Sequence, residues 1–302
     1  ARRSFTPEMN SHDLPRDSRD MSSTRIVSCF TNCYGPFGVW TAADQIRAAG
    51  VEYLELALRG HNLGGLVIPE EVVVTEKADD ATASEFVEHL RRRGVKVSGC
   101  NVGGGDPRTE EGTALTMRRI QFARKWFGVD LVVSGAGQPT NDDERAAVLR
   151  NLRAIGDLAG GLGVTVAFET HKGPTQNATA MLQLMEQLDH PSLRLNFDTG
   201  NIAYYNAGVD PADELERVKE LVRNVHVKDN RGGFEDWYFP ALGEGGAVDF
   251  SRVRTILDGV GYTGAYTIEI EGIGGEPEPG LEARQERIRK SAQHLKACGY
   301  WE

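Results

Sequence analysis

The stretch RLNFDTGN, residues 194–201, alternates polar and apolar side chains and then meets an acid and a turn. In the strand that this alternation predicts, Leu195 and Phe197 share one face while Asn196 and Asp198 share the other. An Asp before a Gly-containing turn often only hydrogen-bonds its own loop. Asp198 therefore acquires a functional meaning only if other strands of the chain end in the same way.

The same unit of strand, loop, amphipathic helix and glycine recurs along the rest of the chain. Eight strands are predicted, beginning at Arg25, Val51, Val95, Val129, Val164, Leu193, Val222 and Ala265. Helices at helical apolar spacing fill the gaps, for example residues 83–93, 143–162 and 282–297. Glycines stand where a helix stops and a strand starts, as left-handed C-caps require: Gly50, Gly94, Gly128 and Gly163. Eight such units predict an α/β fold of the (β/α)₈ TIM-barrel type.

The composition restricts the partners and the location of the protein. The 302 residues carry a formal net charge of −10, which argues against a nucleic-acid partner because phosphate backbones are bound by excess Lys and Arg. No run approaches the ~20 apolar residues of a membrane span. Four scattered cysteines are interpreted as reduced thiols, which favours a cytoplasmic location. A small-molecule substrate is expected, and a homo-oligomer is left open.

One domain is predicted to carry the function. Residues 1–24 are polar and without periodicity, so they are expected to form an N-terminal arm, and residues 25–302 to form the barrel. Three long loops follow strand ends, at 59–80, 101–112 and 229–249. They lie at the end of the barrel where such folds place their sites, so they are predicted to cover a substrate.

Four polar side chains share the inward face near the ends of consecutive strands: Glu169, Asp198, His226 and Glu269. Three carboxylates and an imidazole in one barrel mouth would be costly unless a cation lay between them. The mixed oxygen and nitrogen set suits one divalent ion: Mn²⁺, Mg²⁺, Co²⁺ or Zn²⁺. Because other strands end in the same way, Asp198 is predicted to be one ligand of a metal site.

Several motifs resemble the xylose-isomerase-like superfamily of TIM barrels, which includes sugar isomerases, epimerases, inosose dehydratases and abasic-site endonucleases. The matching segments are VAFETH, NFDTGN, NVHVKDN, LGEGGAVDF and GYTGAYTIEIEG. The resemblance implies that Glu169, Asp198, His226 and Glu269 hold one divalent metal. Glu271 has the same parity as Glu269 and is its rival, but the first acid of IEIEG fits the family pattern better.

The nuclease branch of this superfamily requires three metals and therefore additional ligands. Where that branch has histidines and an Asp-Arg-His segment, this chain has Asn201, Ser134 and the segment 237–239, Trp-Tyr-Phe. A three-metal cluster and a nuclease activity are therefore not expected.

The resemblance and the chemistry of the site together predict an isomerase or epimerase that acts on a keto-sugar. A metal that polarises a carbonyl acidifies the adjacent C–H, and Glu169 and Glu269 would transfer the proton through an enediolate. Expulsion of a β-oxygen or an aglycone would instead make the enzyme a dehydratase or lyase. A sugar-binding barrel without catalysis is the alternative from another class.

The residues expected to touch the sugar or polyol are His171, Asn201, Lys228, Arg231 and Trp237. For His171, a loop position that faces solvent is an equal alternative. For Trp237, packing within its loop is an equal alternative. For Arg231, a solvated loop position is favoured. Glu55 lies in the middle of a predicted strand and is interpreted as a buried, paired core acid. His61 follows that strand and is a weaker candidate for the barrel mouth.

Overall fold

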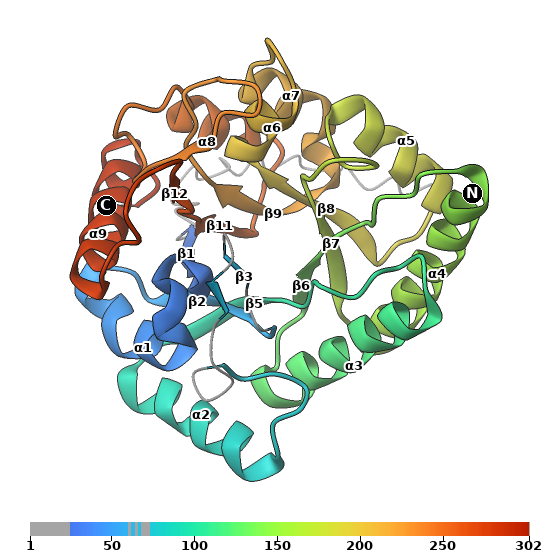
Figure 1. Ribbon diagram of the computed structural model, residues 1–302, viewed down its shortest axis with the longest axis horizontal. Coiled ribbons are helices and arrows are strands. Elements are labelled where there is room, and N and C mark those ends of the chain that lie inside the picture. Colours follow the sequence, from blue (N-terminus) through green and yellow to red (C-terminus); the bar gives the residue numbers. More distant parts are fainter. Residues whose placement is uncertain (1–24, 60–61, 64–65, 68–72, 302) are drawn as a thin grey trace, which may run out of the picture.

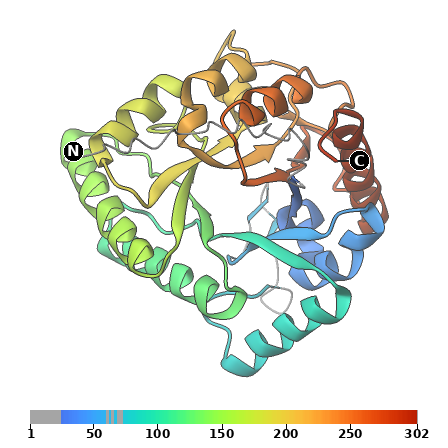
Figure 2. The same ribbon diagram turned by 180° about the vertical axis from the view of Figure 1, so that it is seen from behind.

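Eight parallel strands close into a barrel that helices surround (Figure 1, Figure 2). This computed structural model describes residues 25–301 except 60–61, 64–65 and 68–72, and the side chains of 62–63 and 66–67 are also outside the description. The predicted arm, 1–24, and His61 lie outside the described residues. The barrel strands are β1 Ile26–Phe30, β2 Tyr53–Ala57, β5 Lys96–Asn101, β6 Leu131–Ser134, β7 Thr165–Glu169, β8 Leu193–Asp198, β9 Val222–Val227 and β11 Ala265–Ile268.

The ring order β1-β11-β9-β8-β7-β6-β5-β2 confirms the predicted (β/α)₈ barrel. The helices are η1 Thr31–Phe37, α1 Gly38–Gln45, η2 Ile46–Ala49, α2 Asp80–Arg93, α3 Glu110–Phe127, α4 Asp142–Gly161, α5 Ala178–Leu188, α6 Thr199–Tyr205, α7 Pro211–Val218, η4 Lys219–Leu221, α8 Phe250–Asp258 and α9 Leu281–Ala297. The short strands β3 Asn62–Leu63 and β4 Leu66–Val67 form one antiparallel pair, and β10 Tyr238–Phe239 and β12 Gly272–Ile273 form another.

Local chemistry explains where these helices begin and end. The side chains of Asp79, Thr109 and Asn141 accept hydrogen bonds from the first turns of α2, α3 and α4. Gly94 and Gly128 end α2 and α3 with φ values of 64° and 65°, which other residues adopt only with strain. None of the helices in the described residues is both long and apolar enough to cross a membrane.

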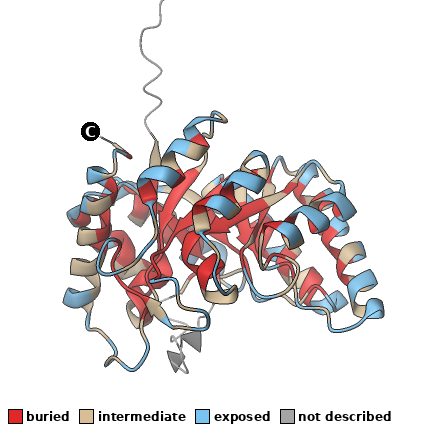
Figure 3. Ribbon diagram, turned by 90° about the horizontal axis from the view of Figure 1, so that it is seen from above, coloured by how far each residue is buried: buried red, intermediate tan, exposed pale blue. Residues whose placement is uncertain are grey.

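In β7 and β8 the large apolar side chains pack outward against the helices, and polar side chains near the strand ends point into the barrel. Phe168 and Phe197 are fully buried in the outer layer, where strands and helices meet. The strands are largely buried, whereas the helices carry exposed residues (Figure 3). Inside, Asn224 Nδ2 donates to Glu55 Oε2 at 2.9 Å and to Asn196 Oδ1 at 3.1 Å. The alternation seen in the sequence therefore describes the two layers of this barrel, and the interior layer leads up to the site.

Candidate functional site

Four side chains that could hold a metal ion converge at the mouth of the barrel. Glu169 and Asp198 end β7 and β8, His226 lies near the end of β9, and Glu269 directly follows β11. One ligand atom from each lies within 4.8 Å of all the others. Asp198 and His226 are fully buried and Glu269 is 2 % exposed, whereas the side chain of Glu169 keeps 16 % of its surface. We call these four residues the metal cradle.

The imidazole of His226 is held by Glu55, which lies on the side of the ring away from the other cradle residues. Its Nε2 lies 3.0 Å from Glu55 Oε1 and 3.2 Å from Oε2, and the ring stacks on Phe30. A proton on Nε2 is therefore shared with Glu55, which leaves the lone pair of Nδ1 for the cradle. Nδ1 lies 3.0 Å from Glu269 Oε2 and 3.5 Å from Glu169 Oε1.

Three buried atoms of the cradle make no hydrogen bond of regular geometry among the described residues: Asp198 Oδ2, His226 Nδ1 and Glu269 Oε2. Their polar neighbours include one another and Lys228 Nζ, at ion-pair distances of 3.0 to 3.5 Å. Burying polar atoms without partners is expensive, at about 1–3 kcal/mol each. Carboxylate oxygens and an imidazole nitrogen are the donors that divalent ions take in proteins. The residues present therefore fit a divalent metal ion.

The charges around the cradle call for a cation as well. Burial opposes protonation of His226, but Glu55 and Glu269 outweigh it and raise the imidazole pKa well above its ordinary value. Burial raises the pKa of Asp198, against the attraction of Lys228. For Glu269 the effect of burial is outweighed by Lys228 and His226, which hold its pKa well below the usual range. A metal ion would supply the positive charge that a proton otherwise brings to His226.

Lys228 directly follows β9, is buried beside the cradle and joins it to a further acid. Its Nζ is 3.5 Å from both Asp198 Oδ2 and Glu269 Oε2, and 2.5 Å from Glu271 Oε2. Glu269 thus belongs to the cluster of possible ligands, and Glu271 pairs with the lysine instead. Of the two rival acids in IEIEG, the geometry favours the first as the ligand.

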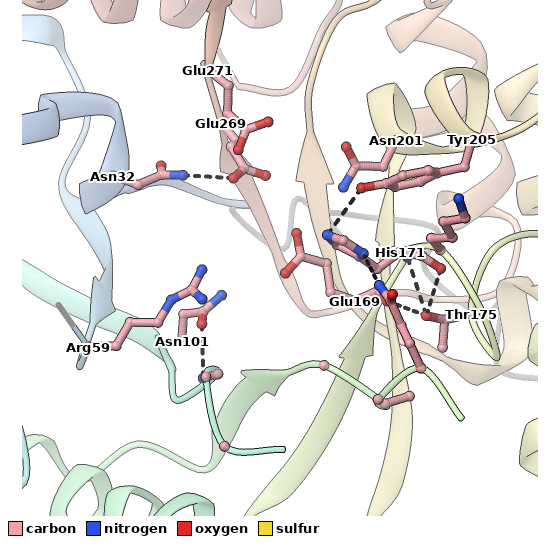
Figure 4. Close-up of a pocket in the computed structure, with 18 of the residues that line it drawn as sticks. Asn32, Arg59, Asn101, Glu169, His171, Thr175, Asn201, Tyr205, Glu269 and Glu271 are labelled. Atoms are coloured by element: carbon pink, nitrogen blue, oxygen red, sulfur yellow. Dashed lines mark hydrogen bonds between the residues drawn. The ribbon is translucent and has the colours of Figure 1, made fainter. Parts of the chain in front are cut away.

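A cavity of about 640 Å³ opens above the cradle (Figure 4). Glu169, at the end of β7, and Glu269 and Glu271, in the segment after β11, line it. Its wall includes an aromatic group from α6 and the loop after β9: Tyr204, Tyr205, Trp237 and Phe239. Its other polar side chains include Asn32, Arg59, Asn101 and His171. Rings combined with fixed polar groups are the usual lining of a site for a sugar-sized ligand.

Three of the residues predicted to touch substrate line this cavity: His171, Asn201 and Trp237. His171 Nε2 lies 3.1 Å from the Tyr205 hydroxyl, and its Nδ1 lies 3.4 Å from Gln138 Nε2 (Figure 4). Burial lowers the pKa of His171, so its neutral form is favoured. Trp237 is 43 % exposed at the rim, where it packs edge-on against Phe239.

The other two predicted contacts lie elsewhere. Lys228 is fully buried, and its Nζ donates to Asn201 Oδ1 at 3.1 Å, so it supports the site as a buried neighbour of the cavity wall. Arg231 does not line the cavity. It pairs with Asp236 and lies over the ring of Tyr238, with its guanidinium carbon 4.5 Å from the ring centroid. The nearest acid in its own loop holds this arginine.

Sequence reasoning missed several supporting residues. Glu55 is buried and paired, as predicted, but its partner is the cradle histidine. Asn32, in η1, donates from Nδ2 to Glu269 Oε1 at 2.8 Å and was not singled out. Only the three-dimensional closure of the barrel brings these segments together, because Glu55 and His226 are 171 positions apart in the chain.

The loop after β9 is anchored by Asp229. Its carboxylate accepts hydrogen bonds from the backbone amides of Asn230 at 3.0 Å, Gly243 at 2.8 Å and Val248 at 3.3 Å. A side chain at Gly246 would overlap this carboxylate. The β10–β12 pairing then fastens the middle of the loop to the segment after β11. Lys228 and Asp229 thus serve the cradle and the loop from adjacent positions.

Comparisons with known proteins agree with this architecture. The family model described as xylose isomerase-like TIM barrel matches residues 43–298. An inosose dehydratase of Geobacillus thermodenitrificans is 26% identical over 264 residues, which cover 81% of this chain and 79% of that protein.

Two solved structures have the same fold. A D-tagatose 3-epimerase-like protein superposes with a TM-score of 0.69 at 18% identity, covering 90% of this chain and 96% of the other. A xylose isomerase-like TIM barrel protein from Mycobacterium smegmatis, in complex with magnesium, also gives 0.69, at 17% identity and with 91% and 98% covered.

Proposed function

Because the chain belongs to the xylose isomerase-like TIM-barrel family, we propose that it is a metal-dependent enzyme that enolises a polyhydroxylated ketone. One observation carries the proposal: two carboxylates of the metal cradle, Glu169 and Glu269, also line the cavity. The substrate is a keto-sugar or a keto-cyclitol. The magnesium in the solved relative supports a hard divalent ion as the cofactor.

A divalent ion held by the cradle would polarise the substrate carbonyl and acidify the neighbouring C–H. Glu169 is the more exposed of the two glutamates, and its side chain reaches the cavity, so it is placed to take that proton. Glu269 is held by Asn32, which donates to its Oε1. The rings of Trp237 and Tyr204 would stack on the sugar and exclude water from the reacting face.

Elimination of water from the enolised substrate is our leading reaction. The sequence alone placed isomerisation or epimerisation first, but the inosose dehydratase relative favours dehydration. A third acid supports this order: Glu271 lines the cavity and pairs with Lys228. Burial raises the pKa of Glu271, which favours a carboxyl that can give a proton to a departing hydroxide.

Epimerisation is the second candidate, and a specific observation favours it. Glu169 ends β7 and Glu269 follows β11, and two other strands, β8 and β9, stand between β7 and β11 in the ring. Two carboxylates from separated strands are able to address opposite faces of one carbon, so that one removes the proton and the other returns it. The epimerase-like fold neighbour is consistent with this chemistry.

Solvent deuterium exchange tests the proposal. The manganese-loaded protein is incubated in D₂O with a panel of keto-inositols and keto-sugars, and products are analysed by NMR and mass spectrometry. We expect deuterium at the carbon beside the carbonyl, and a product lighter by one water if elimination follows. Glu169→Gln serves as the matched control, because it keeps the size of the side chain and removes the base. Metal and sugar binding without exchange would instead indicate a binding protein.

A further inference from the structure

We propose that the substrate of this site carries an oxyanion, a carboxylate or a phosphate, which Arg59 holds on the side of the cavity opposite the metal cradle. The proposal rests on the proposed function, because it names the substrate class of the same site. It is carried by the position of Arg59, by its lack of a partner among the described residues, and by the groups that lie beside it.

Arg59 faces the cradle from across the barrel mouth. It follows β2, and its neighbour Asn101 ends β5. In the ring of eight strands, β2 stands four places from β8, and β5 stands four places from β9. Asp198 ends β8 and His226 lies near the end of β9, so the Arg59 guanidinium and these two residues of the cradle stand on opposite sides of the strand ring. A substrate bound at the cradle extends toward the guanidinium.

Arg59 has no counter-ion within the described residues. No carboxylate there pairs with its guanidinium, and its buried Nε has no hydrogen-bond partner. The other arginine of the cavity is already neutralised, because Arg108 Nη2 pairs with Asp106 Oδ2 at 2.8 Å. A partly buried cation without a partner is costly, and a ligand anion would offset this cost.

The groups next to Arg59 complete a site for oxyanions. Asn101 Oδ1 accepts from the backbone amide of Gly103 at 3.1 Å, so its Nδ2 is left as a donor without an acceptor in the described chain. Gly103 and Gly104 form the adjoining wall without side chains, and a Cβ at Gly103 would lie 3.7 Å from Arg59 Nη1. The guanidinium fork and an amide N–H₂ match the oxygens of a carboxylate or a phosphate.

The cradle and the wall that carries Arg59 together indicate which chemical groups the ligand has. The cradle takes the carbonyl and its neighbouring hydroxyl, and the opposite wall takes the anion. A neutral sugar in this cavity would leave Arg59 without a counter-ion among the described residues, whereas a keto-sugar acid or a keto-sugar phosphate would neutralise it. The glycine-rich segment 101–107 lacks the G-x-G-x-x-G pattern of dinucleotide-binding loops. In this proposal it forms the wall next to the bound anion.

Binding calorimetry with the metal-loaded protein tests this inference without requiring turnover. The probes are D-glucose, D-glucuronate and D-glucose 6-phosphate, which share a ring and differ in charge. We expect at least one anionic probe to bind about tenfold more tightly than glucose, the range of a charge-assisted hydrogen bond. A preference for glucuronate identifies a carboxylate, and a preference for the sugar phosphate identifies a phosphate. Equal binding, or no binding of either anion, overturns the inference.

Variants separate Arg59 from the metal as the source of any preference. Arg59→Gln is expected to abolish it, Arg59→Lys to retain part of it, and Arg108→Gln to leave it intact because that arginine is already paired. A preference that survives in Arg59→Gln would assign the anion to the metal and refute the proposal. The outcomes are independent of the exchange assay: anion preference without exchange contradicts only the proposed reaction, and exchange without anion preference contradicts only this inference.

Discussion

Replacing Glu55 by Gln should weaken metal binding, although Glu55 is not a ligand. Its carboxylate accepts from His226 Nε2 at 3.0 Å and from Asn224 Nδ2 at 2.9 Å. Gln offers one acceptor oxygen and one N–H₂ group, so one of these two donors must lose its partner. The alternative is that the imidazole moves its proton to Nδ1, which then cannot bind the metal.

The size of the effect follows from that geometry. One buried donor without a partner costs about 1–3 kcal/mol, which corresponds to roughly 5- to 150-fold in affinity. Residues behind a metal ligand typically contribute about 10–100-fold, in the same range. The assay is competition for Mn²⁺ against a fluorescent chelator, with circular dichroism to confirm the fold.

Glu76→Gln is the matched control for this experiment. Glu76 is also a largely buried acid, and it pairs with Arg119 at 2.8 Å outside the cradle. We expect its replacement to leave the Kd for Mn²⁺ unchanged. An unchanged Kd in a folded Glu55→Gln variant would refute the assignment of Glu55 as the group that orients His226.

Three further predictions concern ligands, base and pH. Asp198→Asn should sharply lower metal content measured by elemental analysis, whereas Glu271→Gln should leave it unchanged; the reverse would make Glu271 the ligand. Glu169→Gln should abolish turnover while substrate still binds. Unchanged turnover in this variant would exclude Glu169 as the base. Arg287 holds the pKa of Glu276 below its ordinary value, so this pair stabilises the fold at neutral pH and its contribution is lost as pH falls through that lowered pKa, below about 4.3. Thermal unfolding of Glu276→Gln should therefore differ from the parent at pH 7 and converge with it in acid, and a constant difference would contradict the pairing.

The barrel itself was predictable because each unit carries its own signals. Parity along the strands placed Asp198 and Glu269 on the inner face, although β11 ends at Ile268, one residue before the acid. Gly94 and Gly128 marked the helix ends through local backbone chemistry, which requires no knowledge of distant contacts. Alternation and capping act over a few residues, and those features of the sequence agree with the structure.

Contacts between distant segments could not be predicted in the same way. Glu55 was recognisable as a core acid, but nothing near it in the sequence indicates His226 as its partner. Arg59 gave no signal at all, because an arginine after a strand is usually solvated. Arg231 illustrates the opposite case, in which proximity to the metal histidine in sequence suggested a contact that Asp236 takes instead. Side-chain direction beyond a strand end depends on the loop fold, which the alternation does not encode.

Because Lys228 and Asp229 are adjacent, the middle of the loop after β9 can be considered for replacement separately from the site acids. Lys228 lies within ion-pair distance of Asp198, while Asp229 closes the loop on itself through the amides at both of its ends. The segment 231–242 between those anchors carries Trp237 but contributes no cradle ligand. Replacing this segment is therefore expected to change which molecule is accepted and to leave the cradle in place, provided that an aromatic ring is kept where the Phe239 ring centroid lies 4.5 Å from Lys228 Nζ. The residue that supports the reactive acids, Lys228, and the residue that anchors the substrate-facing loop, Asp229, are therefore joined by one peptide bond.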